Sequence, residues 1–149
     1  GFSFYAKKGG TGIRVHPKPV EKFKQKLKEI TGRSKSMSME QRMEKLRQCI
    51  IGWVNYFNMA DMNNLVKTLD KWLRRRIRMC FWKQWKKVKT KHENLVKLGI
   101  AKSKAWEYAN TRKSYWHTAN SPILSRTLTN EYLKKIGFVS ISERYSLGH

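Results

Sequence analysis

The sequence predicts a mainly α-helical protein with one short β-hairpin at its N-terminus. Three stretches between residues 17 and 85 repeat apolar residues at the three- and four-residue spacing of amphipathic helices. Shorter stretches of this kind continue to residue 136, whereas apolar residues alternate only within residues 1–16. We therefore expect a three-helix bundle followed by a small helical module.

The expected hairpin surrounds a glycine-rich segment. Phe2 and Phe4 precede Gly9-Gly10-Thr11-Gly12, and Ile13 and Val15 follow it. We interpret the glycines as the turn. A phosphate-binding loop is disfavoured, because the Lys-Ser/Thr pair and the strand-to-helix context of such loops are missing.

The first helix is predicted to begin near Pro17, a residue that suits a first helical turn. Thr31-Gly32 is expected to end it. Lysines occupy much of its remaining surface. Its inner face is formed by Val20, Phe23, Leu27 and Ile30.

The second and third helices each have a candidate capping residue. Ser38, with Gln41 three residues later, predicts a capping box, and Asp61 is a candidate cap for the third helix, which we extend to about Trp85. The predicted apolar faces contain Met39, Met43, Leu46, Ile50, Trp53 and Phe57 in the second helix, and Leu65, Leu69, Trp72, Leu73, Ile77 and Cys80 in the third.

The last third of the chain is predicted to form shorter elements. Residues 86–91 are expected to be a linker or a strained turn, and we place a boundary there. Helices are predicted over 92–98, 103–112 and 121–136, each with glycine, proline or serine near an end. Residues 138–147 fit either an extended segment or a final helical turn.

Charge is the dominant property of the sequence. The chain has 33 Lys and Arg against 10 Asp and Glu, a net charge of +23. A compact body this positive repels itself unless a polyanion neutralises it, so nucleic acid is the first candidate partner and an anionic membrane surface the second. The sequence has no apolar run of about 18 residues and no signal peptide, so we expect a protein that does not span a membrane. Its two scattered cysteines fit a cytoplasmic setting.

The residue types that usually carry catalysis are few and scattered. The acidic residues form no metal-binding pair, and the four histidines have no ligand spacing, so we predict no catalytic residue, metal or cofactor in this chain. Cys49 and Cys80 lie in apolar surroundings and are expected to be reduced core residues, although sequence does not exclude a disulfide.

The strongest functional signal lies in residues 67–91, which contain 11 basic residues and only Asp70 as an acid. Helical spacing places Lys67, Lys71, Arg74, Arg75 and Arg78 on one broad face. Like charges at that spacing destabilise an isolated helix, which favours a docking face for nucleic acid over a solvated basic face. Trp72 is expected in the core. Trp82 and Trp85 fit either the core or base stacking.

We expect phosphates to be bound by arginines and lysines from several elements. About eight phosphate contacts on single strands would give a slope near −6 in a plot of log affinity against log salt. The predicted contacts are Lys24, Lys28, Lys67, Lys71, Arg74, Arg75, Arg78, Lys83, Lys86, Lys87, Lys89, Lys91, Arg112, Lys113 and Arg126.

Several strings together resemble the C-terminal part of bacterial group II intron reverse transcriptases, also called maturases. The N-terminal string Gly1-Phe2-Ser3-Phe4-Tyr5 is similar to the end of the polymerase palm. Three further strings resemble the maturase-specific thumb, or domain X. They are Val20-Glu21-Lys22-Phe23-Lys24, Gly52-Trp53-Val54-Asn55-Tyr56-Phe57 and the basic segment from Arg74 to Lys86. The last strings, Asn120-Ser121-Pro122-Ile123-Leu124 and Asn130-Glu131-Tyr132-Leu133, resemble the DNA-binding region that follows the thumb.

This resemblance implies three segments: the end of the palm over 1–16, the thumb over 17–88 and the DNA-binding region over 89–149. It also implies binding to group II intron RNA and to template–primer or target DNA, in support of splicing and retrohoming. The parent protein would be an RNA-directed DNA polymerase that uses Mg²⁺. This chain, which opens without Met, would be a fragment of that protein.

The alternative interpretation is a stand-alone basic structural protein that binds RNA as ribosomal proteins do. Composition alone does not separate it from the maturase interpretation, because both require a basic helical domain.

Overall fold

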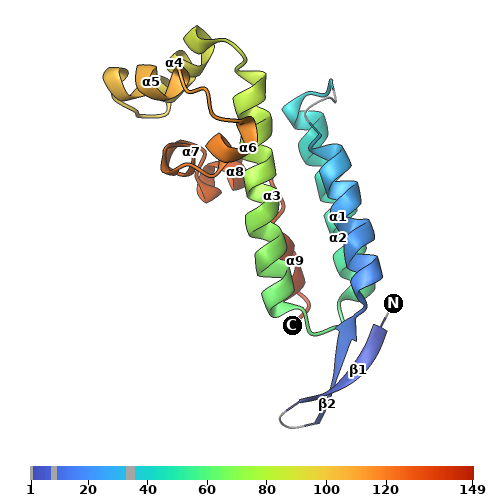
Figure 1. The fold of residues 1–149 in the computed structure, drawn as a ribbon. Coiled ribbons are helices and arrows are strands. Elements are labelled where there is room, and N and C mark those ends of the chain that lie inside the picture. The colour runs from blue at the N-terminus through green and yellow to red at the C-terminus, as the bar shows by residue number, and fades with distance from the viewer. Residues whose placement is uncertain (1, 8–9, 33–35) are drawn as a thin grey trace. The chain divides into compact units, whose positions relative to one another are not determined.

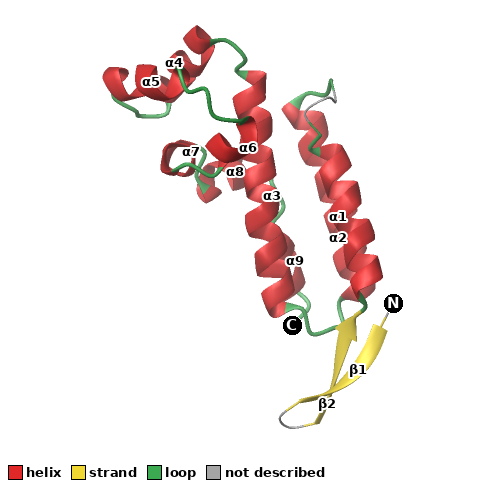
Figure 2. Cartoon of the chain, viewed as in Figure 1, coloured by secondary structure: helices red, strands yellow, loops and turns green. Residues whose placement is uncertain are grey.

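The computed structural model describes residues 2–7, 10–32 and 36–149. Within them nine helices account for most of the chain, and the only strands form one antiparallel hairpin (Figure 2). The predicted mainly α-helical fold with an N-terminal hairpin is therefore confirmed. The chain forms two compact units: unit 1 is Gly1–Leu73 with Gly137–His149, and unit 2 is Arg74–Ile136.

The compact units divide the chain at other places than the predicted segments. One division falls inside a continuous helix, between Leu73 and Arg74, and the other precedes Gly137. The C-terminal residues therefore belong to the same unit as the N-terminal hairpin. The functional boundaries at 16/17 and 88/89 stay predictions.

The hairpin pairs β1 (Phe2–Lys7) with β2 (Gly10–Val15), with Phe2 opposite Val15. Gly10 and Gly12 lie inside β2, so the expectation that they form the turn was wrong. Gly12 is required by close packing, because a Cβ there would overlap the ring of Tyr5. Gly1, Gly9 and residues 33–35 lie outside the described residues.

Asp61 holds the hairpin against the loop that precedes the third helix. Its backbone N–H donates to the carbonyl of Ile13 at 2.6 Å. Its carboxylate accepts from the Tyr5 hydroxyl at 3.0 Å and from the Ile13 N–H at 3.2 Å. The helix begins two residues later, at Asn63, so Asp61, the predicted cap, anchors the hairpin instead.

The helices α1 (Pro17–Ile30) and α2 (Met39–Phe57) lie side by side in unit 1 (Figure 1). The capping box of Ser38 and Gln41 is present, as predicted, and fixes the start of α2. The guanidinium of Arg42 is buried and donates to the carbonyl of Ile30, which satisfies the end of α1. The core between these helices includes Phe23, Leu27, Met43, Leu46, Ile50 and Val54.

The long helix α3 (Asn63–Gln84) ends one residue before the predicted limit. Its first half belongs to unit 1, where the buried Asp70 carboxylate accepts hydrogen bonds from the N–H groups of Ile141 (2.6 Å) and Ser142 (2.9 Å). These bonds cap α9 (Ile141–Ser146), which decides residues 138–147 in favour of a helical turn. The Tyr145 hydroxyl also donates to the Ala60 carbonyl at 2.7 Å.

Unit 2 contains the second half of α3 and five shorter helices: α4 (Val88–Lys97), α5 (Lys102–Ala109), α6 (Tyr115–Ala119), α7 (Pro122–Thr127) and α8 (Asn130–Lys135). The linker or turn predicted over 86–91 is present only at residues 86 and 87, because α4 begins at Val88. The predicted helix over 121–136 is broken at Leu128, where the Thr129 hydroxyl caps a new helix by accepting from the N–H of Tyr132 at 3.0 Å.

Two further expectations concern the membrane and the cysteines. Among the described residues, every helix is too short or too polar to cross a bilayer. Both cysteines are free thiols: Cys80 is buried in unit 2, and Cys49 is half-buried on α2. The disulfide that the sequence left open is absent.

Candidate nucleic-acid interface

The structure separates the predicted phosphate contacts by their exposure. Nine are exposed, four are half-buried and two are buried. The exposed residues are Lys28, Lys67, Lys71, Lys86, Lys87, Lys89, Arg112, Lys113 and Arg126, the half-buried ones Lys24, Arg74, Arg75 and Lys83, and the buried ones Arg78 and Lys91. Because a phosphate contact needs an accessible cation, the exposed residues carry the candidate interface.

In unit 1, Lys67 and Lys71 lie one turn apart on the outer face of α3. Lys24, on α1, is placed differently, since its ammonium lies 5.1 Å from the centre of the Trp72 ring. Trp72, which was expected in the core, is half-buried, and this cation–π contact covers part of its ring.

In unit 2, Arg75 contacts its own chain. Its Nε and Nη2 both donate to the carbonyl of Trp116, at 3.0 and 2.8 Å. Its guanidinium also lies 3.8 Å from the centre of the Trp116 ring. Two bonds and a stacked ring hold this arginine to α6, a helix that the sequence analysis did not predict.

Arg78 is the clearest case of an internal contact. Its side chain is 9% exposed, with Nε donating to the Leu128 carbonyl at 2.8 Å and Nη2 to the Asn130 side chain at 2.9 Å. Burial lowers the pKa of this guanidinium, and the charge of Arg74 lowers it further. Arg78 thus fixes the corner between α7 and α8, which leaves little of it for a phosphate.

Lys91, on α4, is enclosed by aromatic rings. Its ammonium lies 4.7 Å from the centre of the Trp82 ring and 5.5 Å from that of Tyr115, and the residue is 8% exposed. Burial lowers the pKa of this ammonium. Its position therefore favours a structural role over a phosphate contact.

A compact group of exposed cations follows the end of α3. Lys86 and Lys87 lie in the turn after the helix, and Lys89 lies in the first turn of α4. The aromatic residues beside them are packed inside unit 2, with Trp82 1% and Trp85 8% exposed. The core interpretation of these two tryptophans is confirmed, so this group offers charge without a stacking surface.

The predicted DNA-side residues also lie in unit 2. Arg112 and Lys113 are exposed in the loop between α5 and α6, and Arg126 is exposed on α7. The Thr111 hydroxyl accepts from the N–H of Lys113 at 3.3 Å, which orders this loop locally.

Sequence reasoning missed the structural roles of Asp70 and Arg42. Both are charged, buried and hydrogen-bonded to a helix end. A single acid within a long basic stretch was the available signal for Asp70, because an isolated opposite charge often has an internal partner. Nothing in the sequence marked Arg42 among its basic neighbours.

The described residues offer no site for the Mg²⁺ that the resemblance implies for a parent polymerase. In residues 2–7, 10–32 and 36–149, no three His, Cys, Asp or Glu side chains gather closely enough to hold a metal ion. Hard cations need several oxygen ligands, so we derive no chemical step through this metal.

The chain was compared with protein families and with curated proteins. No curated protein matches the chain closely enough to count as a relative. Residues 20–99, more than half of the chain, match the family described as "Group II intron, maturase-specific domain". The match begins in α1, includes α2 and α3, and ends just after α4. This chain therefore belongs to the maturase-specific domain family of group II introns.

Proposed function

We propose that this chain binds group II intron RNA and the template–primer, and so supports splicing and retrohoming. The main observation that supports this proposal is a set of exposed lysines on α3 and directly after it. These lysines lie inside the segment that matches the family. These lysines are Lys67, Lys71, Lys86, Lys87 and Lys89.

The chemistry of these residues supports the proposal. An exposed ammonium is a mobile point charge that contacts a phosphate without needing a fixed geometry. Each contact releases counterions from the nucleic acid, which supplies affinity without base recognition. With a net charge of +23, the chain attracts any polyanion, so the shape of the intron RNA must supply the preference.

For target DNA we propose the exposed residues Arg112, Lys113 and Arg126. They follow the matched segment in the chain, as a DNA-binding region after a thumb would. Arginine can hold a phosphate by two parallel hydrogen bonds, which suits it to positioning a duplex backbone.

The test uses exposed lysines, because changing Arg75 or Arg78 would also remove contacts that hold unit 2 together. Binding of the chain to a group II intron RNA is measured over a salt series, with an unrelated structured RNA of equal length as the comparison. The variant is Lys86/Lys87/Lys89→Gln. The matched control is Lys97/Lys102/Lys104→Gln, which removes three lysines that are exposed but outside the predicted set.

We expect tighter binding to the intron RNA and a wild-type slope near −6 in log affinity against log salt. The first variant should make that slope shallower by about 2, since each lost phosphate contact removes about 0.7. The control should change it by less. Equal affinity for both RNAs would contradict the intron partner, and equal slopes for the variant and its control would contradict the assigned surface.

A further inference from the structure

An open groove lies between α1 and α2 in unit 1, and none of the predicted phosphate contacts lines it. Its volume is about 1040 Å³, at the upper end of the roughly 300–1,000 Å³ typical of ligand pockets. One wall comes from α1 and the turn before it, and the other from the C-terminal half of α2. A groove of this size can accept more than one planar group.

The α2 wall is aromatic. The rings of Trp53 and Phe23 stack at 4.3 Å with an angle of 3°, and Phe57 packs 4.8 Å from Trp53. Tyr56 also lines the groove. Its ring lies 4.8 Å from that of Phe57 and, nearly parallel, 6.5 Å from that of Phe2, yet the residue is 72% exposed and can accept a further ring. A large exposed ring on a rigid aromatic cluster is the kind of surface on which bases stack.

The α1 wall is cationic. Lys18, Lys22 and Lys26 lie four residues apart, so they form one line along the helix, and all three line the groove. Like charges at this spacing destabilise a helix, and a bound anion would relieve that repulsion. The positive charge of Lys26 also reaches the groove-lining thiol of Cys49, where it opposes the rise in pKa that burial causes.

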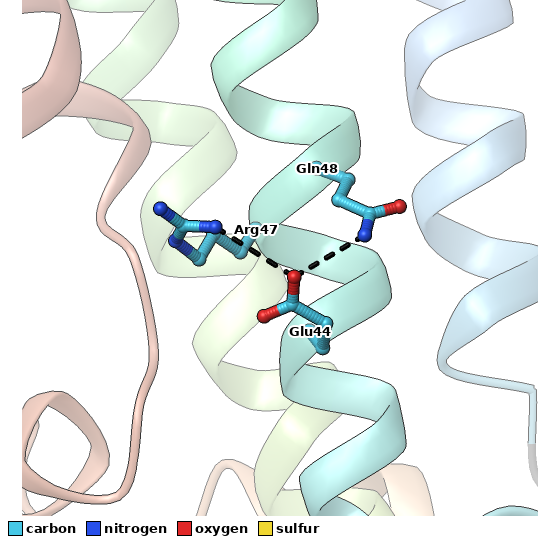
Figure 3. Close-up of polar contacts among 3 residues, drawn as sticks. All are labelled: Glu44, Arg47 and Gln48. Atoms are coloured by element: carbon cyan, nitrogen blue, oxygen red, sulfur yellow. Dashed lines mark hydrogen bonds and ion pairs between the residues drawn. The ribbon is translucent and has the colours of Figure 1, made fainter.

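Acidic side chains are absent from the residues that line the groove, all of which the structure describes. On α2, Glu44 lies outside this lining, and its partners are Arg47 and the groove-lining Gln48. Its carboxylate lies 3.6 Å from Nη1 of Arg47 and accepts from Nε2 of Gln48 at 3.2 Å (Figure 3). The electrostatics of the groove therefore favour a negatively charged occupant.

Gly52 keeps the groove open. It lies inside α2, lines the groove, and a Cβ built there meets no atom within 4 Å. Glycine destabilises a helix interior relative to alanine, so Gly52 makes α2 less stable than alanine would. In return, no side chain extends from this position into the groove. This position can be filled by a larger side chain without a clash.

We propose that this groove binds an unpaired segment of RNA, with a base stacked on Tyr56 and phosphates on the lysines of α1. The proposal deepens and rests on the proposed function, because it names the part of the intron RNA that unit 1 recognises. A duplex would present its backbone and keep its bases stacked inside, so it would leave the aromatic wall uncovered. A second copy of this chain would bring a further charge of +23 and be repelled.

The experiment measures fluorescence anisotropy of the complete chain with a labelled 12-nucleotide oligouridylate and with a 12-base-pair RNA duplex. Two variants attack the groove: Tyr56→Ala removes the exposed ring, and Gly52→Leu fills the space. Two controls match them: Tyr56→Phe keeps the ring, and Lys45→Gln removes an exposed α2 cation outside the groove. Urea unfolding of each variant shows that it is folded.

We expect Tyr56→Ala and Gly52→Leu to weaken oligouridylate binding roughly 5- to 100-fold, the range for the loss of one stacked base. The controls, and duplex binding by every variant, should change by less than about 2-fold. Saturating oligouridylate should also slow alkylation of Cys49, which lines the same groove, while Cys80 is buried.

Unchanged oligouridylate affinity in both groove variants would overturn the proposal, and so would an equal loss for the duplex. Tighter binding of the matching DNA strand would overturn the assignment to RNA. A dimer that the groove variants dissociate would assign the groove to a second copy, and tighter binding of an acidic peptide would assign it to a protein.

The two proposals can fail separately. If the groove variants leave oligouridylate binding unchanged while the chain still prefers intron RNA, the proposed function stands. If the groove binds oligouridylate without any preference for intron RNA, only the proposed function fails.

Discussion

Two regions of this protein contain a high density of positive charge, but the structure uses their charges differently. In the segment 74–91 of unit 2, Arg75, Arg78 and Lys91 contact carbonyls and aromatic rings of their own chain. In the α1–α2 groove of unit 1, three lysines line open space beside an exposed tyrosine. Charge density along a sequence therefore does not locate an interface by itself.

The difference has a physical cause. Arginine can donate several hydrogen bonds from one rigid plane. An arginine on α3 can therefore donate to the backbone carbonyls of the short helices packed around it. Lysine on an exposed helix face keeps its ammonium in water. Arg75 and Arg78 of α3 stabilise unit 2, whereas most of the lysines stay accessible to a ligand.

Replacing Arg78 should have the largest effect on stability. Arg78→Ala leaves the buried Leu128 carbonyl and the Asn130 side chain without their donor, and we expect a loss of about 2–3 kcal/mol. Urea unfolding followed by far-UV circular dichroism measures it. The matched control Arg126→Ala, at an exposed site on α7, should change stability by less than about 0.5 kcal/mol. Equal effects at the two sites would remove the contrast.

Filling the groove lightly should stabilise unit 1. Gly52→Ala replaces glycine inside α2 at a place where a Cβ meets nothing within 4 Å, so we expect a gain of about 0.5–1 kcal/mol. Urea unfolding of the wild type and the variant measures the gain. Gly12→Ala is the contrasting change, since it would clash with Tyr5 and destabilise the hairpin. A loss of stability in Gly52→Ala would show that the groove wall is already packed.

The buried ammonium of Lys91 should make stability depend on pH. Its pKa is lowered in the folded state, so between that lowered value and the ordinary 10.5 the unfolded chain binds more protons. The contribution of Lys91 to stability should therefore rise as pH rises through this window. Lys91→Met removes the ionisable group and should remove this rise. Unfolding free energies of both proteins between pH 7 and 10.5 measure the difference. Parallel curves would show an accessible ammonium.

The smallest effect is kinetic and concerns Cys49. Burial raises the pKa of this thiol above its usual 9.0, so its thiolate is scarcer at pH 8 than that of an ordinary cysteine. We expect iodoacetamide to alkylate it several-fold more slowly than a free cysteine, with the rate still rising above pH 9. Lys26→Gln should slow it further, because the opposing charge of Lys26 is lost. A rate that rises or stays level in that variant would contradict the electrostatic link between the groove walls.

Much of the fold followed from local patterns. The helices α1, α2 and α3 have apolar faces at helical spacing and strong end signals, such as the box of Ser38 and Gln41, so they were predicted almost to the residue. The shorter helices were predicted less well. The break at Leu128 depends on Thr129 as a cap and Arg78 as a distant donor, and α6 was missed because five residues show no period.

The helical fold, the strong positive charge and the relation to maturases follow from the sequence, because periodicity, composition and ordered motifs are properties of the unfolded chain too. Which cations are available to a ligand follows from the packing of the helices. Arg78 and Lys87 belong to the same basic segment of the sequence. In the structure Arg78 is buried and donates to a carbonyl, whereas Lys87 is exposed. The groove between α1 and α2 was equally invisible, since its two walls lie about thirty residues apart and meet only when the helices pack. Burial and partnership depend on contacts between distant residues, and such contacts exist only in the folded chain.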